Sequence, residues 1–309
     1  MSAGRPEFWV YLPQMRMSFS TIGERARAAE AAGFDGVALM DHLAPPGLTS
    51  ADMYDAMTTA AAVAAGTERL KVGHLVLCGS FRHPCVLAKE VVSLDHLSGG
   101  RFELGLGWGS VPGELERFGL AAEDSRTRAA RLAEALDVLA ALFTGEDVDY
   151  DGDFYPLRGA RQSPRPLAGR VPVVIGGGGP KLTMPLVARH ADWWNCPSYA
   201  HLRLEKLRPL AGKARVSTQH PVGLAAGPGD VERVAEVARR RFGGWGGLIG
   251  GGGRTGGAGA CRTGGARSGA VLPPVQRLRD GGDAGAVRRR GHPGRHRNRG
   301  EMTRPVRDQ

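Results

Sequence analysis

The forty residues from Leu70 to Gly109 read LKVGHLVLCGSFRHPCVLAKEVVSLDHLSGGRFELGLGWG, and this stretch decides the fold. The apolar residues at 70–77 predict a buried strand, a helical pattern follows at 84–97, and a second apolar run at 102–106 predicts another strand. Nearly uniform apolar strands joined by helices are typical of parallel sheets, because both faces of such a sheet are covered. The stretch therefore predicts a strand–helix–strand unit.

The same unit repeats on both sides of this stretch. Strands are predicted at 8–12, 34–40, 70–77, 102–106, 171–175, 191–196 and around 222–224. Helices are predicted at 21–33, with Thr21 as N-cap, and at 52–66, 84–97, 123–144, 180–190, 201–213 and 229–242. Residues 145–170 lack a helical period and are interpreted as an insertion. Six or seven such units in about 250 residues favour an α/β fold of the TIM (β/α)8 barrel type over a five-stranded open sheet.

The charge of the chain is concentrated at one end. The 309 residues carry a net charge of +10, from 41 Lys and Arg against 31 Asp and Glu. Residues 251–309 contain thirteen Arg, four acidic residues and no aromatic residue, a net charge of +9, so residues 1–250 are nearly neutral. We therefore divide the chain into a barrel domain at 1–250 and a basic, Gly- and Arg-rich tail at 251–309. The tail cannot bury enough apolar surface to offset the entropy of ordering it, which predicts disorder.

Several classes of protein are excluded by what the sequence lacks. No run of about 18 apolar residues occurs, so no membrane-spanning helix is expected. The first residues do not have the pattern of a signal peptide, so we expect a cytoplasmic protein. Cys78, Cys85, Cys196 and Cys261 lie far apart, which predicts reduced thiols and no metal site. The Arg-rich tail suggests a nucleic-acid partner, but it has no aromatic residues for stacking, and a small-molecule substrate is favoured instead.

In a barrel of this type the chemistry lies at the carboxyl ends of the strands. The residues that follow the second, third and fourth predicted strands are Asp41 and His42, Cys78 and Gly79, and Gly107 and Trp108. His42 is a candidate acid/base group or cofactor contact, or else a structural residue. Trp108 can stack on an aromatic ligand, if its ring faces the rim.

A run of four glycines follows the fifth predicted strand: Gly176, Gly177, Gly178 and Gly179, then Pro180 and Lys181. Pro is favoured at the first position of a helix, so the run lies between a strand and a helix. Backbone N–H groups in such a loop can approach an anion, and Lys181 adds positive charge. The loop is therefore a candidate phosphate site, or else a flexible turn. It is not a P-loop, because Pro180 precedes Lys181 and no Ser or Thr follows.

Several separated motifs together resemble a known family. Within 70–109 the motifs RHP, LAK, LDHLSGGR and ELGLGWG, then GFDGVALMDHL at 33–43, VPVVIGGGGPK at 171–181 and ADWWN at 191–195, are similar to those of the bacterial luciferase-like, flavin-dependent oxidoreductases. The resemblance covers about residues 7–250. It implies a (β/α)8 barrel that binds FMN or the deazaflavin coenzyme F420 at the carboxyl rim. The Gly-, Ala- and Arg-rich composition is typical of GC-rich actinobacterial genes, which favours F420 over FMN.

The resemblance also implies roles for individual residues. The ring of the cofactor is expected near Asp41 and His42, the bulge at Cys78 and Gly79, and Gly107 and Trp108. Its phosphate end is expected on Gly176–Gly179, with Lys181. By the same resemblance His42 is the candidate proton donor and Glu114 a second acid/base group. A non-proline cis peptide is expected near Cys78–Gly79, and a homodimer is typical of the family.

The match to the family stops near Gly250. Members normally continue with a helix, an eighth strand and a last helix, so we expect a barrel that is either complete or without these last elements. Synonymous codons for residues 253–293, read one base later, encode a stretch with a helix, a strand and another helix. We therefore hypothesise a shifted reading frame near 250–253, which resequencing of the gene would test. The alternatives to an oxidoreductase are an inactive remnant of one, or a basic protein associated with nucleic acid.

Overall fold

The computed structural model describes residues 5–47, 50–120, 123–225, 227–242, 249–252 and 267–271. The chain divides into two compact units, Met1–Pro274 and Val275–Gln309, and all described residues belong to the first. Most of the tail predicted at 251–309, Cys261 included, therefore lies outside the described residues.

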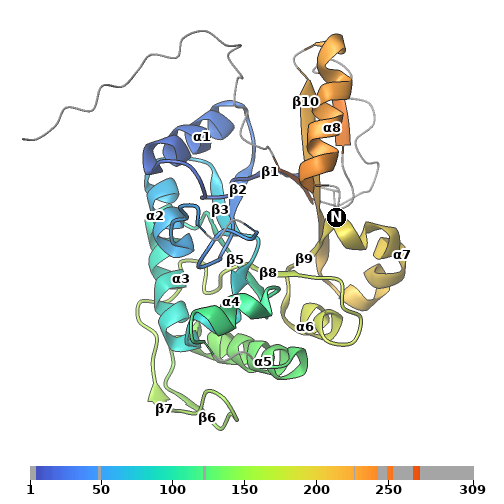
Figure 1. Ribbon diagram of the computed structural model, residues 1–309. Helices are drawn as coiled ribbons and strands as arrows, with labels where there is room; N and C mark the ends of the chain where they lie inside the picture. Colours follow the sequence, from blue (N-terminus) through green and yellow to red (C-terminus); the bar gives the residue numbers. More distant parts are fainter. Residues whose placement is uncertain are drawn as a thin grey trace, which may run out of the picture. The chain divides into compact units, whose positions relative to one another are not determined.

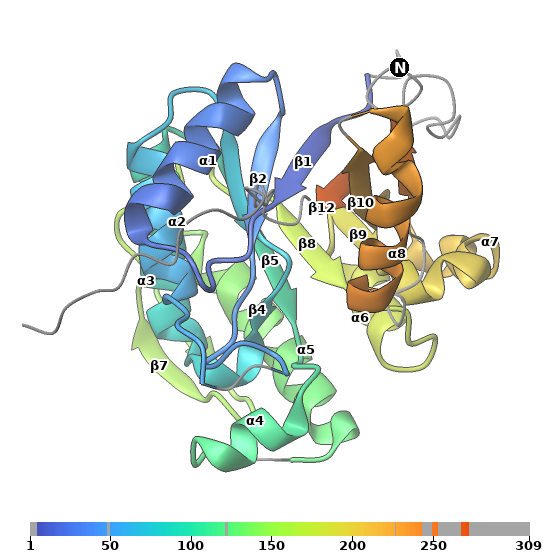
Figure 2. The ribbon, with the colours of Figure 1, turned by 45° about the horizontal axis from the view of Figure 1, so that its top comes forward.

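A parallel sheet curled into a barrel forms the centre of the first unit (Figures 1 and 2). Its strands are β1 (Phe8–Tyr11), β2 (Gly36–Leu39), β3 (Lys71–His74), β4 (Leu77–Cys78), β5 (Phe102–Gly107), β8 (Val173–Gly176), β9 (Trp193–Cys196), β10 (Arg215–Ala225), β11 (Ile249–Gly252) and β12 (Arg267–Val271). Each of β1, β2, β3, β5, β8, β9, β10 and β12 pairs in parallel with the next, and β12 pairs with β1. The predicted α/β barrel is confirmed.

The eighth position of the barrel is filled by β12. Tyr11 of β1 lies opposite Val271, and Ser217 of β10 lies opposite Arg267 on the other edge of β12. β11 pairs with the carboxyl half of β10. Of the two alternatives for the end of the barrel, the one with an eighth strand therefore holds, whereas the residues after β12 lie outside the described residues.

Helices connect the strands, and several of them cover the outer face of the barrel (Figure 2). They are α1 (Phe19–Ala31), α2 (Ala56–Ala65), α3 (Pro84–Ser98), α4 (Pro112–Arg117), α5 (Ser125–Leu142), α6 (Thr183–His190), α7 (Leu204–Leu207) and α8 (Val231–Phe242). Short 3-10 segments are η1 (Gly79–Phe81), η2 (Ser198–Arg203), η3 (Arg208–Ala211) and η4 (Pro228–Asp230). Figure 2 shows α1, α2 and α3 side by side outside β1–β3, with α8 next to β10.

Polar side chains fix where the helices begin. Asp55 and Asp124 accept hydrogen bonds from backbone N–H groups three residues on, each at 2.7 Å, and so cap α2 and α5. The predicted N-cap Thr21 is wrong, because Ser18 caps α1 and its hydroxyl accepts the N–H of Thr21 at 3.2 Å. Gly99 ends α3 with φ of +62°, a conformation that favours glycine.

Two predicted segments differ from the structure, and the predicted insertion has strands of its own. The helix predicted at 201–213 is a series of short turns, η2, α7 and η3. The strand predicted around 222–224 begins seven residues earlier, as β10. The insertion at 145–170 holds a hairpin of β6 (Val148–Tyr150) and β7 (Leu157–Ala160). Buried Glu134 of α5 accepts the backbone N–H groups of Phe154 and Tyr155 and so anchors this hairpin.

The core lies on both faces of the parallel strands. Leu39, Val72, Leu104, Ile175 and Trp194, from five different strands, are fully buried. Strands that are covered on both faces explain the uniform apolar runs in the sequence. None of the helices in the described residues is long and apolar enough to cross a membrane.

Candidate active site

A cavity of about 460 Å³ opens at the carboxyl ends of β2, β4, β5 and β8. Its lining comprises Met40, Asp41, His42, Leu75, Val76, Leu77, Cys78, Phe81, Gly107, Trp108, Gly109, Ser110, Val111, Glu114, Leu115, Gly176, Gly177, Gly178, Gly179, Thr183, Tyr199 and Arg203. The cavity lies where the barrel was predicted to carry its chemistry.

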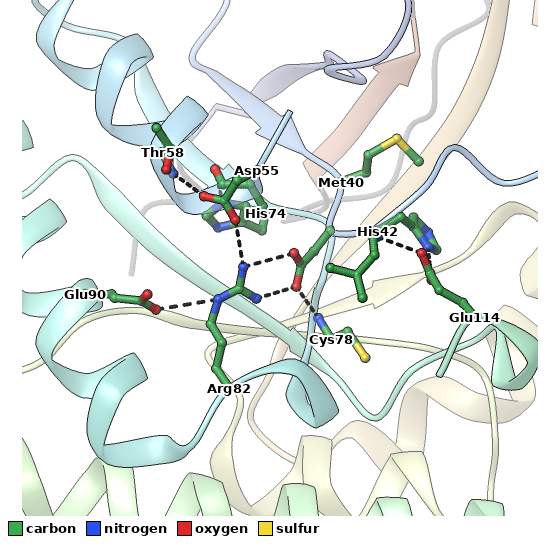
Figure 3. A network of polar contacts seen from close by, with 12 residues as sticks. Met40, His42, Asp55, Thr58, His74, Cys78, Arg82, Glu90 and Glu114 are labelled. Carbon is green, nitrogen blue, oxygen red and sulfur yellow. Dashed lines mark hydrogen bonds and ion pairs between the residues drawn. The ribbon is translucent and has the colours of Figure 1, made fainter. Parts of the chain in front are cut away.

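A histidine and a carboxylate are paired at this cavity. His42 follows β2, and its Nδ1 lies 2.8 Å from Oε2 of Glu114, which belongs to α4 (Figure 3). Oε1 of Glu114 accepts the backbone N–H groups of Leu43 at 2.7 Å and Ala44 at 3.1 Å. The Glu114 side chain is 4% exposed and that of His42 is 18% exposed. The glutamate is thus held by three hydrogen bonds and fixes the orientation of the imidazole.

Asp41 faces the same cavity with a different set of partners. Its Oδ2 accepts the backbone N–H of Cys78 at 2.9 Å and Nη1 of Arg82 at 2.7 Å, and its Oδ1 accepts Nη2 of Arg82 at 3.2 Å. Burial raises the pKa of the Cys78 thiol to about 11, so this cysteine is protonated at neutral pH. Burial thus favours the neutral thiol of Cys78, and Asp41 orders the backbone at the end of β4.

Trp108 lies at the end of β5. Its Nε1 donates to Oγ1 of Thr183 at 3.4 Å, which ties it to the first residue of α6. The guanidinium of buried Arg128 lies 5.4 Å from the centre of the indole ring, and its Nε donates to the Trp108 carbonyl at 3.2 Å. The indole is therefore held from two sides.

The glycines around the cavity are required by close packing. A Cβ on Gly178 would lie 2.8 Å from Cβ of Ala200, and a Cβ on Gly107 would lie 2.8 Å from Val76. Gly177 has φ of +131°, which side chains rarely adopt. The loop after β8 thus presents its backbone, without side chains, to the cavity.

The structure brings together most of the residues that the sequence predicted. Those that line the cavity are Asp41, His42, Cys78, Gly107, Trp108, Glu114 and the four glycines of 176–179. Two others do not line it. Lys181 is exposed, because α6 begins only at Thr183 and not at the predicted residue 180. Gly79 begins η1 behind the cavity wall, where a Cβ would lie 3.2 Å from the carbonyl oxygen of Gly107.

Some site residues were missed from the sequence. Arg203 and Tyr199 line the cavity from η2, in a segment for which only a helix was predicted. Arg82 reaches the site through Asp41. The RHP motif at 82–84 pointed to this arginine, but only the fold shows which carboxylates it meets.

The cis peptide expected at the third-strand bulge lies three residues earlier than predicted. It joins Leu75 and Val76, and not Cys78 and Gly79. Both residues line the cavity. Neighbouring His74 points into the core, where burial lowers the pKa of its imidazole to about 4.

Comparison with known proteins shows which family the chain resembles over most of its length. Residues 4–240 match the model of the luciferase-like monooxygenase family. Over 218 residues the chain is 37% identical to an F420-dependent glucose-6-phosphate dehydrogenase from Nocardia farcinica, covering 68% of this chain and 61% of that protein. A protein of the same name from Beutenbergia cavernae is 39% identical over 171 residues, 55% of this chain and 50% of that protein. The chain thus spans half to three-fifths of the length of these relatives.

Solved structures show the same fold. An F420-dependent secondary alcohol dehydrogenase, in complex with an F420-acetone adduct, superposes with a TM-score of 0.66 at 21% identity, over 76% of this chain and 74% of that one. EDTA monooxygenase from Chelativorans sp. BNC1 superposes with a TM-score of 0.67 at 17% identity, over 77% and 66% of the two chains. The barrel, its carboxyl-end cavity and the match over most of the chain lead to one conclusion: this protein belongs to the luciferase-like monooxygenase family.

Proposed function

We propose that the protein is an F420-dependent oxidoreductase, which transfers a hydride between the deazaflavin and a small organic substrate. The observation that carries the proposal is the His42–Glu114 pair on the wall of a cavity that also contains the glycine loop after β8. The sequence relatives described above are named as F420-dependent enzymes at 37–39% identity, which supports F420 rather than FMN.

The residues around the cavity fit a cofactor of this kind. A phosphate needs a backbone that can approach it closely, and the loop at 176–179 offers one without side chains, which a Cβ on Gly178 would displace because it would lie 2.8 Å from Cβ of Ala200. Arg203 lines the cavity and would add positive charge at this loop, because a Cβ on Gly178 would lie 3.3 Å from its Nη2. Trp108 and the ordered backbone at Cys78 would hold the aromatic ring.

The chemistry requires one group that accepts a hydride and one that accepts a proton. Coenzyme F420, when bound, supplies the two-electron hydride acceptor. Because Nδ1 of His42 is engaged by Glu114, Nε2 is the nitrogen left to face a substrate. In the oxidation of an alcohol, Nε2 would accept the proton of the hydroxyl group, while the hydride leaves the carbon that bears this group, so that a carbonyl forms. Glu114 stabilises the imidazolium that results.

Turnover assays test this proposal directly. The purified protein is mixed with oxidised F420 and one substrate, which is glucose 6-phosphate in one assay and 2-propanol in another. The loss of the absorbance band of oxidised F420 is followed in each assay. We expect substrate-dependent bleaching with one class of alcohol. If the protein binds F420 but neither alcohol causes bleaching, the proposed reaction is contradicted.

FMN is the alternative cofactor. Solved structures that share the fold hold it, such as the oxygenating constituent of 3,6-diketocamphane monooxygenase from Pseudomonas putida, at 19% identity and a TM-score of 0.60. A sequence identity of 19% shows a shared fold and not a shared cofactor, so we retain F420 as the proposed cofactor. The same assay with FMN, NADH and oxygen distinguishes the two cofactors.

A further inference from the structure

Arg82 lies at the centre of a cluster of three carboxylates, one of which, Asp41, lines the cavity (Figure 3). Its guanidinium contacts Asp41 at 2.7 Å, Asp55 at 3.2 Å and Glu90 at 3.6 Å. The Arg82 side chain is 14% exposed. Burial alone would lower its pKa, but the hydrogen bonds and the charge of Asp41, with Glu90 and Asp55 adding to it, raise the pKa instead. Arg82 is therefore a permanent cation in this cluster.

The three carboxylates are not equivalent. Asp41 lines the cavity and is 4% exposed on its side chain, whereas Asp55 caps α2 and Glu90 lies on α3. Neither Asp55 nor Glu90 belongs to the cavity lining. Arg82 thus links a carboxylate of the site to two carboxylates of the scaffold.

The hydrogen bonds of Asp41 leave one acceptor position open. Oδ2 already accepts two donors, the Cys78 N–H and Nη1 of Arg82, while among the described residues Oδ1 accepts only Nη2 of Arg82. A carboxylate oxygen can accept two hydrogen bonds, so Oδ1 can take one more. The two-point contact with a planar guanidinium fixes the plane of the carboxylate and hence the direction of that open position.

We propose that Arg82 is a positioning residue for the cofactor: it holds the Asp41 carboxylate, and through it the Cys78 backbone, in the arrangement that the cofactor ring meets on binding. This inference rests on the proposed function for the identity of the ligand. It assigns to Arg82 a role in affinity that goes beyond its role in joining η1 to α2 and α3. The orientation of the acceptor is set before the ligand arrives, so that binding does not have to order it.

A double-mutant cycle separates the two roles of Arg82. Arg82→Met removes the cation, Asp41→Asn removes the acceptor charge, and F420 binding is measured by fluorescence titration. If Arg82 acts through Asp41, each single variant weakens binding by about tenfold, and the double variant is no weaker than either. An Arg82→Met variant that binds F420 as the wild type does, or effects that multiply in the double variant, would overturn the proposal.

Matched controls come from the other two carboxylates. Asp55→Asn keeps an acceptor for the N-cap of α2, and Glu90→Gln is isosteric, so both weaken the cluster without touching Asp41. We expect both to change the F420 affinity by less than about twofold, although they lower the thermal midpoint of unfolding. A loss of affinity in these controls that equals the loss in Arg82→Met would show that general loosening of the cluster is the cause, and would overturn the proposal.

A readout without ligand keeps this inference separate from the proposed function. The backbone N–H of Cys78 donates to Asp41, so its hydrogen exchange reports the position of that carboxylate. We expect exchange at Cys78 to become at least about tenfold faster in Arg82→Met and to stay unchanged in Asp55→Asn. Unchanged exchange in Arg82→Met overturns the role of Arg82 even if F420 never binds, while failure of wild type to bind F420 overturns only the proposed function. If Arg82→Met does not fold, Arg82→Lys, which keeps the charge and loses the two-point contact, takes its place in each comparison.

Discussion

At the scale of single residues, the site is built from pairs that are distant in the sequence. His42 was predicted from its place at the end of a strand, but its partner Glu114 is 72 residues away on α4, a helix that no sequence pattern indicated. Glu114 entered the prediction only through the family resemblance. The length of six residues explains why α4 was missed, because so short a helix has too few turns to show a period.

Removal of the His42 imidazole is expected to affect the reaction and not the binding of cofactor. His42→Asn should lower kcat by about 100-fold or more, because a positioned acid/base group contributes at least that much. Glu114→Gln should lower kcat less, because Nε2 of His42 remains in place. Steady-state assays measure kcat of both variants, and titrations measure their affinity for F420. A His42→Asn variant with the kcat of the wild type would contradict the assigned role.

His74 is expected to make the stability of the fold depend on pH. Burial lowers its folded-state pKa to about 4, while an unfolded chain has the ordinary value of 6.5. Below about pH 6.5 the unfolded state takes up a proton that the folded state does not, so stability is full above this pH and falls toward pH 4. The loss reaches about 2 kcal/mol by pH 5. Urea unfolding at pH 7.5 and pH 5 measures it, and His74→Gln should remove this part of the difference; an equal loss in both proteins would exclude His74 as its source.

At the scale of elements, the sequence indicated the strands well and the connecting turns poorly. The strands that were predicted around 34–40, 102–106 and 171–175 are present because parallel strands, buried on both faces, leave long apolar runs. The segment at 201–213 has the composition of a helix, yet it folds as η2, α7 and η3. Local propensity was overridden there by tertiary contacts, because η2 lines the cavity and contacts β10, and η3 packs on α6.

The glycine loop after β8 is expected to tolerate no side chain. In Gly178→Ala the new Cβ would lie 2.8 Å from Cβ of Ala200, so the loop must shift, and we expect F420 affinity to fall by about tenfold or more. Gly23→Ala is the control. It lies inside α1, where a Cβ would meet only the flexible end of Arg27, and it should stabilise the fold by about 0.5–1 kcal/mol with F420 affinity unchanged. Equal F420 affinities in both variants would contradict the role of the loop.

The hairpin of β6 and β7 is expected to depend on Glu134. This buried carboxylate accepts the N–H groups of Phe154 at 3.0 Å and Tyr155 at 2.6 Å, and Glu134→Ala leaves both donors without it. The free energy of unfolding should fall by about 2–4 kcal/mol. Asp149→Ala removes an exposed acceptor for Gly159 in the same hairpin and should cost less than about 1 kcal/mol. Chemical denaturation measures the free energy of unfolding of both variants. A larger loss in Asp149→Ala than in Glu134→Ala would contradict the role of Glu134.

At the scale of the whole molecule, the sequence predicted the family and the barrel, but it did not predict how the barrel closes. Repeated strand–helix units predicted the architecture, and separated motifs predicted the family. The match to the family ends near Gly250, which left open whether the eighth strand is present, and β12 at Arg267–Val271 takes that position in a Gly- and Arg-rich segment. Backbone hydrogen bonds to the edges of β1 and β10 do not require apolar side chains. The composition of the segment therefore does not indicate this strand.

Parallel titrations of the 309-residue protein with F420 and with FMN show whether this chain carries an F420 site. Cofactor fluorescence is followed at constant protein concentration, with Gly178→Ala as the variant that should weaken the site. We expect saturable binding of F420, tighter than that of FMN and weakened by Gly178→Ala. Saturable binding of FMN with none of F420, or no binding of either, would contradict it.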